Sequence, residues 1–173
     1  FSFPGTLQLI TFDSNRFIQD VVERWRDQPL DGVLSTDEYI GAICAAGIAR
    51  ELGLAGADPG HIVLAQHKYY SRMAQREVIP EAAPGCTLFP RVGVQEADLA
   101  IDFPMFVKPV KGTFSVFAAL VNDIGELREH LRFNVLERLA IKRVTRPFNQ
   151  LLRRYTDLEH NADFFTGEGL MKG

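Results

Sequence analysis

The stretch from residue 103 to residue 121, FPMFVKPVKGTFSVFAALV, decides the fold of the second half of this chain. Its two apolar runs, Phe103 to Val110 and Ser115 to Val121, each have the length of an ordinary strand. Between them, Lys111-Gly112-Thr113 has the composition of a turn. We therefore expect a β-hairpin whose tip, from Lys111 to Phe114, is mobile when no ligand is bound.

One charged residue, Lys108, interrupts the first of these apolar runs. It has two interpretations. An edge strand often carries a lysine that points to solvent and prevents aggregation. Alternatively, the ammonium group is a point charge aimed at an anion. The glycine, threonine and serine that follow supply amides and hydroxyls able to close over phosphate oxygens, which favours an anion.

A helical pattern follows the hairpin and gives the second half of the chain an α+β character. Asn122-Asp123 is expected to cap a helix that carries Leu127 and Leu131. A longer helical region continues to Tyr155 and is expected to be interrupted at Pro147. Its basic residues alternate with apolar ones, which favours an amphipathic helix with a solvated basic face over a nucleic-acid-binding helix.

The sequence before the hairpin alternates between strand and helix patterns, which predicts an α/β fold with a parallel sheet. Ser35-Thr36-Asp37-Glu38 has the form of a capping box, in which Glu38 reaches back to the serine. Trp25 continues an apolar helical stripe and is interpreted as a packing residue. The predicted elements are strands at Leu7–Phe12 and Gly32–Ser35, and helices at Asn15–Gln28 and Ile40–Leu52.

A further helix is expected from His61 to about Glu77, with Lys68, Arg72 and Arg76 recurring every four residues. The segment Ile79 to Gly85 contains two prolines and a glycine, so it reads as a connector. We place the domain boundary there. The two predicted domains are residues 1–80 and residues 81–173.

Composition narrows the class of protein. The 173 residues are 46% apolar and 24% charged, with a net charge of −3, which is typical of a globular protein and gives no reason to expect nucleic acid or an anionic membrane as a partner. Cys44 and Cys86 are too few for a disulfide framework, so we expect reduced thiols and a cytoplasmic location. No apolar run is long enough to span a bilayer and no signal peptide is recognisable.

Several motifs in order resemble the ATP-grasp superfamily. The segment Pro104 to Pro109, followed by Gly112 and Ser115-Val116, is similar to that family's central hairpin. Asp123 to Leu127 stands where the family carries an acidic-leucine turn, and His67-Lys68 stands where it has an Asp-Lys pair. The resemblance covers about Leu30 to Leu127 and includes Leu52 to Gly56 and Ile79-Pro80.

This resemblance implies a fold and a set of ATP-binding residues. The fold would be a partial nucleotide-fold (pre-ATP-grasp) domain with parallel strands, followed by the first, α+β half of an ATP-grasp module. Lys68 and Lys108 match the family's two lysines on the ATP phosphates. Phe106 would face the adenine. The loop formed by Gly112, Thr113 and Ser115 would cover the triphosphate.

The resemblance also implies an activity, that of a carboxylate-amine or carboxylate-thiol ligase. A carboxylate attacks the γ-phosphorus of ATP, and an amine or other nucleophile then displaces the acyl phosphate. The implied partners are ATP, Mg²⁺ and small carboxylate and amine substrates, without nucleic acid or membrane. The oligomeric state stays open between a monomer and a homodimer. Catalytic residues are not identified.

Both ends of the sequence look cut, so we expect a truncated fragment of a longer ligase. The family's magnesium ligands are expected beyond residue 173, and the 173-residue chain by itself is therefore expected to be inactive. The alternative is a non-catalytic α/β domain of related architecture that serves binding or assembly. No Walker-type loop, nucleophile elbow or zinc-type histidine spacing is present to suggest a third class.

Overall fold

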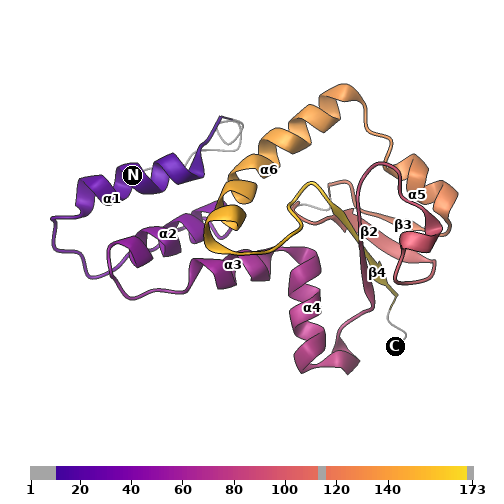
Figure 1. Cartoon of the computed structure of the whole chain (residues 1–173), viewed down its shortest axis with the longest axis horizontal. Helices are drawn as coiled ribbons and strands as arrows, with labels where there is room; N and C mark the ends of the chain where they lie inside the picture. Colours follow the sequence, from indigo (N-terminus) through magenta and orange to yellow (C-terminus); the bar gives the residue numbers. More distant parts are fainter. Residues whose placement is uncertain (1–10, 113–115, 171–173) are drawn as a thin grey trace. The chain divides into compact units, whose positions relative to one another are not determined.

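The computed structural model describes residues 11–112 and 116–170. The chain divides into two compact units, one formed by residues 1–66 and 140–159, the other by residues 67–139 and 160–173. Figure 1 shows their elements along the chain. The domain boundary proposed at residue 80 concerns the organisation of the parent protein and remains a prediction.

The described part of the first unit is helical. Helix α1 (Ser14–Trp25) begins at Asp13, whose carboxylate accepts the Arg16 N–H. Its buried side chains, Ile18, Val21 and Val22, pack toward helix α2 (Ile40–Glu51). Helix α3 (Pro59–Gln66) follows, and most of α6 (Val135–Tyr155) completes the unit.

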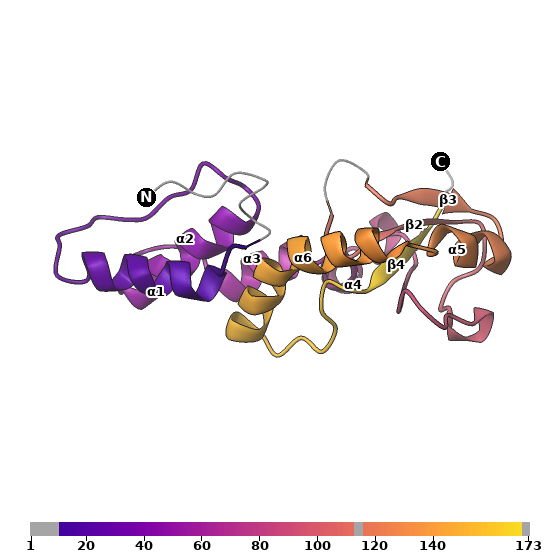
Figure 2. The same ribbon diagram turned by 90° about the horizontal axis from the view of Figure 1, so that it is seen from above.

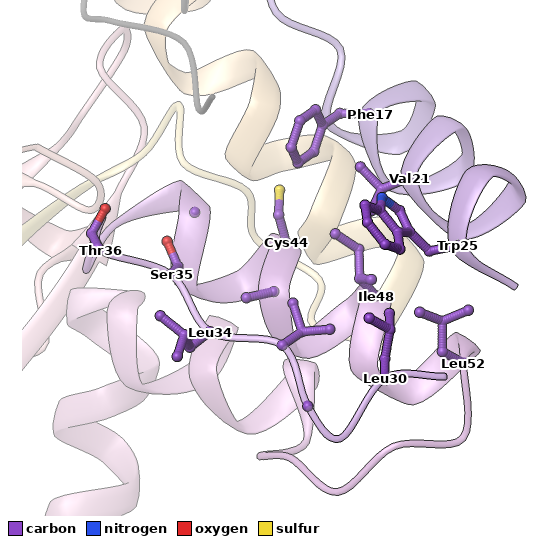
Figure 3. Close-up of a pocket in the computed structure, with 14 residues that line it drawn as sticks. Phe17, Val21, Trp25, Leu30, Leu34, Ser35, Thr36, Cys44, Ile48 and Leu52 are labelled. Atoms are coloured by element: carbon purple, nitrogen blue, oxygen red, sulfur yellow. The ribbon is translucent and has the colours of Figure 1, made fainter. Parts of the chain in front are cut away.

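The predicted strand at Gly32–Ser35 is wrong: this segment is irregular and pairs with no strand in the described residues. A strand needs the backbone hydrogen bonds of a neighbour, and its expected partner, Leu7–Phe12, lies mostly outside the described residues. The parallel sheet is therefore not observed. Instead, residues 30–36 line a hollow of about 420 Å³ with α1 and α2 (Figure 3).

The predicted capping box before α2 is also wrong. Helix α2 begins at Ile40, which is too far along the chain for Ser35 to cap it. The N-cap residue is Tyr39, and its side chain makes no capping hydrogen bond. The Ser35 hydroxyl instead accepts the Asp37 N–H, and the Asp37 carboxylate accepts the Gly41 N–H at 2.6 Å. Asp37, rather than Glu38, thus satisfies an amide in the first turn.

The second unit contains a four-stranded antiparallel sheet formed by β1 (Cys86–Phe89), β2 (Met105–Pro109), β3 (Ala119–Val121) and β4 (Phe165–Gly169). The strand order is β1-β4-β2-β3. Strands β2, β3 and β4 are labelled in Figures 1 and 2. The predicted hairpin is confirmed, because β2 pairs with β3 and Phe106 lies opposite Leu120. The second strand of the hairpin is shorter than predicted, since Phe117 adopts a positive φ of 56° just before it.

One face of this sheet forms the hydrophobic core of the unit. Met105 and Val107 of β2 are fully buried there, together with Phe165 of β4. Helix α5 (Ile124–His130) covers this face through Leu127. As predicted, Asp123 caps α5, accepting the Glu126 N–H at 2.8 Å.

The helix predicted from His61 to Glu77 is two helices. Helix α3 ends at Gln66, and α4 (Lys68–Val78) begins after His67, whose backbone is extended. The His67 imidazole accepts the Tyr70 N–H through Nδ1 and therefore donates from Nε2 to the His160 carbonyl, 3.0 Å away. Histidine thus acts as the helix cap.

Helix α6 runs through Pro147 without the predicted interruption. A proline removes one helical hydrogen bond, that to the carbonyl four residues earlier. Here that carbonyl belongs to Arg143, which is exposed and can bond to water instead. The helix begins with a reciprocal pair in which Asn134 and Glu137 accept each other's backbone N–H. Two short 3₁₀ helices, Pro80–Ala82 and Glu96–Asp98, complete the elements of the described residues.

Candidate functional site

The sheet face opposite the core carries the polar side chains of interest. Because side chains alternate along a strand, Phe106 and Lys108 share the face that Met105 and Val107 do not. Phe106 lies opposite Glu168 of β4, so this carboxylate shares the same face. Helix α4 approaches this face from the β1 side, where the sulfur atoms of Met73 and Cys86 lie 3.8 Å apart.

Glu168 is the centre of a charge cluster. Its Oε1 lies 2.8 Å from Lys108 Nζ and accepts the Arg72 Nε–H at 3.0 Å. Burial alone would raise the pKa of the Glu168 carboxyl, but the hydrogen bonds from Lys108 and Arg72 outweigh it and lower that pKa below its ordinary value. The Glu168 and Lys108 side chains are only 10% and 18% exposed, so this pair is little screened by solvent.

Lys68, the first residue of α4, adds a second ammonium group. Its Nζ donates to the Gly112 carbonyl at 2.8 Å, and its backbone N–H donates to the Val110 carbonyl at 3.3 Å. Burial, and to a smaller extent the Lys108 charge, lower the Lys68 pKa to about 8, although the Glu168 carboxylate partly opposes both effects. At pH 7 about nine in ten Lys68 side chains are therefore still charged.

Helix geometry explains why α4 contributes two cations. Lys68 and Arg72 are four residues apart, so they lie on one side of the helix. The helix start is fixed by His67, which is fully buried, and by the Lys68 backbone bond to the end of β2. Arg72 and Lys108 thus contact one carboxylate, that of Glu168. Lys68 lies near enough for the charges of Lys108 and Glu168 to influence its pKa.

An apolar surface adjoins this charge cluster. Phe106 is 38% exposed and its cross-strand neighbour Leu120 is 50% exposed. Leu170, two residues beyond Glu168, is also exposed. An exposed aromatic ring next to paired cations can bind a molecule with a flat apolar part and an anionic part.

The structure brings together four of the residues predicted as ATP-binding: Lys68, Phe106, Lys108 and Gly112 all belong to the second unit. Thr113 and Ser115 lie outside the described residues, as does half of the predicted mobile tip, residues 113 and 114. The interpretation of Lys108 as an edge-strand lysine is wrong, because β2 is paired on both sides.

Sequence reasoning noted Glu168 only as an available carboxylate and assigned it no role, and it gave Arg72 no partner. The available signal for Glu168 was a lone carboxylate flanked by glycines in an apolar segment, Phe164 to Leu170. An unpaired carboxylate in a sheet is costly to bury, so such a residue calls for a cationic partner. The partners, however, are 60 and 96 residues away in sequence, and only the strand order reveals them.

Neither a metal site nor a membrane-spanning helix is found within the described residues. No group of three or more histidine, cysteine, aspartate or glutamate side chains there could hold a metal ion. No helix in the same part of the chain has the length and apolarity needed to cross a membrane.

The architecture defines a class: a mixed α/β chain in which helices accompany a four-stranded antiparallel sheet. The crystal structure of L-amino acid ligase from Bacillus licheniformis has this fold over 95% of the present chain, with a TM-score of 0.62 and 22% sequence identity. The match spans 35% of that ligase chain. No family model and no curated protein sequence matches. The predicted mixed α/β fold is therefore confirmed. Membership of the ATP-grasp superfamily stays a prediction.

Proposed function

We propose that this chain is part of an ATP-dependent ligase that activates a carboxylate as an acyl phosphate for attack by an amine or another nucleophile. One observation carries the proposal: Lys68 and Lys108 lie in one cluster, on the sheet face that also presents Phe106. The likeness to a ligase fold supports it.

The cations suit the phosphates of ATP. Phosphoryl transfer spreads negative charge over the phosphate oxygens, so positioned cations stabilise the transition state. Lysine supplies a compact charge with three donors, and the Lys68 and Lys108 ammonium groups come from two different elements, α4 and β2. They would hold the triphosphate from two sides, while Arg72 supplies a further donor.

The apolar part of the face suits the nucleobase. In the proposed complex the adenine ring lies against Phe106, two residues before Lys108 on the same side of β2. The loop of Gly112, Thr113 and Ser115 covers the triphosphate, and excluding water protects an acyl phosphate from hydrolysis. Lys68 already contacts this loop through the Gly112 carbonyl.

Bound ATP would supply the phosphoryl group, and the residues described here would position it. Magnesium is proposed as a second cofactor of the whole protein. Because the described residues offer no cluster of metal ligands, we derive no step through the metal. The proposed role of this chain is to bind and orient the nucleotide.

Glu168 gives the site a specific requirement. Its carboxylate lies 2.8 Å from Lys108 Nζ and 3.0 Å from Arg72 Nε. A phosphate that approaches Lys108 must therefore share that ammonium group with Glu168 or displace it. The ammonium has three hydrogens, so sharing leaves the ion pair intact and needs only a small rotation of the side chain.

The test is ATP titration of the whole protein by calorimetry, with Lys108→Met as the variant. We expect a loss of about 1.5–3 kcal/mol in binding free energy if one charged contact is removed. Lys142→Met, at an exposed position of α6, is the matched control. Unchanged ATP affinity in Lys108→Met would reject the assignment and favour a non-catalytic domain.

A companion assay concerns the 173-residue chain alone. With ATP, magnesium and a panel of amino acids, we expect no ADP release above the Lys108→Met background, because positioned cations do not replace bridging by a metal. We expect ATP to bind this chain no more tightly than about 1 mM. Amino-acid-dependent ADP release would show that this chain is a complete enzyme.

A further inference from the structure

The second unit, which contains the four-stranded sheet, has a hollow of about 680 Å³ on the side of the sheet that α5 covers. Three elements form it: the loop after β1, the end of α5 and the start of α6. Its floor is apolar, since Val94 and Leu131 are buried core residues and Phe133 packs against the same core. No acidic residue is among its described lining residues. Its walls carry four arginines, which are Arg91, Arg128, Arg132 and Arg138.

The charges of these arginines are largely uncompensated. Within the described residues, the Arg91 and Arg138 guanidinium groups make no hydrogen bond or ion pair. Arg128 is held in place, but by neutral acceptors: the Val94 carbonyl at 3.2 Å and the Gln95 side-chain oxygen at 2.7 Å. Arg132 alone among the four has a carboxylate partner, an exposed glutamate one turn earlier in α5.

Two carboxylates close in sequence to the lining residues, those of Asp98 and Glu137, bind backbone amides. Asp98 accepts the Gln95 N–H at 3.0 Å, and Glu137 accepts the Asn134 N–H at 2.8 Å. Both therefore act as caps for short backbone segments instead of as partners for arginine. In a chain whose net charge is −3, this concentration of positive charge is local.

The backbone of Gly93, in one wall of the hollow, is accessible to a bound group. Gly93 has a φ of +81°, a conformation that favours glycine, and a Cβ built there would meet no atom within 4 Å. A group entering the hollow can therefore approach the Gly93 backbone without steric hindrance. Planar guanidinium groups form bidentate hydrogen bonds with two oxygen atoms of a carboxylate or phosphate. The arginines and the accessible Gly93 backbone therefore suit an oxyanion.

We propose that this hollow binds a small anion carrying two or more phosphate or carboxylate groups. The concave shape, the apolar floor and the convergence of arginines from three elements favour a small molecule over an acidic protein segment. The site is separate from the Lys68–Lys108 cluster, because it lies on the α5 side, and the proposal does not depend on the proposed ligase function.

The experiment titrates the isotopically labelled 173-residue chain with pyrophosphate and, separately, with citrate, and follows amide signals by two-dimensional NMR. We expect saturable shifts at Gly93 and Gln95 below about 10 mM anion, weakened by added salt. The double variant Arg91→Gln/Arg138→Gln should weaken binding about tenfold or more. It removes no contact found in the described residues, so it should fold.

Two control variants locate the binding. Arg26→Gln removes one exposed charge in the first unit and should leave the shifts unchanged. Lys108→Met should also leave them unchanged, which separates this hollow from the proposed ATP site. The tighter of the two anions identifies the preferred group. The proposal is overturned if Gly93 and Gln95 do not shift, or if the double variant binds like the wild type. It is equally overturned if a glutamate hexapeptide shifts these amides at lower concentration than both small anions.

Discussion

Acidification from about pH 7 to about pH 5 is expected to weaken the second unit through one buried histidine. His67 is fully buried, and both ring nitrogens are used: Nδ1 accepts the Tyr70 N–H and Nε2 donates to the His160 carbonyl. Burial lowers the His67 pKa from 6.5 to about 4, more than the His160 carbonyl raises it. A proton on Nδ1 would abolish the cap of α4.

The sign and size of the effect follow from this shift. The unfolded chain binds a proton at His67 between pH 6.5 and 4, while the folded chain does not. Stability is therefore complete above pH 6.5 and falls as the pH drops toward 4. A pH of 5 lies about 1.5 units below the pKa of the imidazole in the unfolded chain. At that pH the free energy of unfolding is therefore lower by about 2 kcal/mol.

The assay is urea unfolding followed by circular dichroism at both pH values, in the wild type and in His67→Asn. Asparagine can still cap the helix but does not titrate, so the variant should lose about 2 kcal/mol less between the two pH values. His61→Asn, at an exposed position, is the control and should behave like the wild type. An equal loss in wild type and His67→Asn would refute the assignment of the acid sensitivity to His67.

Two further outcomes are expected in the cluster. ATP affinity measured against pH should be level up to about pH 8 and fall above it, because Lys68 loses its proton there. In Lys68→Met the loss of ATP affinity above pH 8 should disappear. If the variant still loses affinity there, the loss does not come from Lys68. Glu168→Gln should lower the free energy of unfolding by about 2 kcal/mol, since it leaves Lys108 and Arg72 partly buried without a carboxylate. Glu129→Gln breaks an exposed pair and should cost less than about 0.5 kcal/mol in the same urea titration.

Local signals in the sequence predicted the hairpin well. Apolar runs on either side of a glycine turn encode strand pairing between neighbours, and β2 and β3 pair as expected. The Asp123 cap of α5 is equally local and was also predicted. The break at His67 was not, because histidine is not a usual cap. It takes that role here since the fold buries it against the His160 carbonyl, 93 residues later.

The candidate site was half predictable. Lys108 could be recognised because it is the one charged residue in a predicted apolar strand. Lys68 was predicted as a binding residue only through the resemblance to a known family. Their surroundings depend on a pairing across the chain: Glu168 reaches Lys108 only because β4 lies next to β2. In the first unit, the pattern of Gly32–Ser35 predicted a strand, but an apolar run forms one only where a partner strand is available.

The position of β4 between β1 and β2 has a consequence for how the protein is made. On the ribosome, residues 86–89 and 105–109 emerge well before residues 165–169, and these two earlier strands are not neighbours in the finished sheet. Until the last described strand leaves the exit tunnel, β1 has no partner among the described strands and one backbone edge of β2 stays unpaired, so both strands are open to other chains. The nascent protein thus passes through an interval in which the sheet is two separate pieces, and a chaperone that shields strand edges would act during that interval.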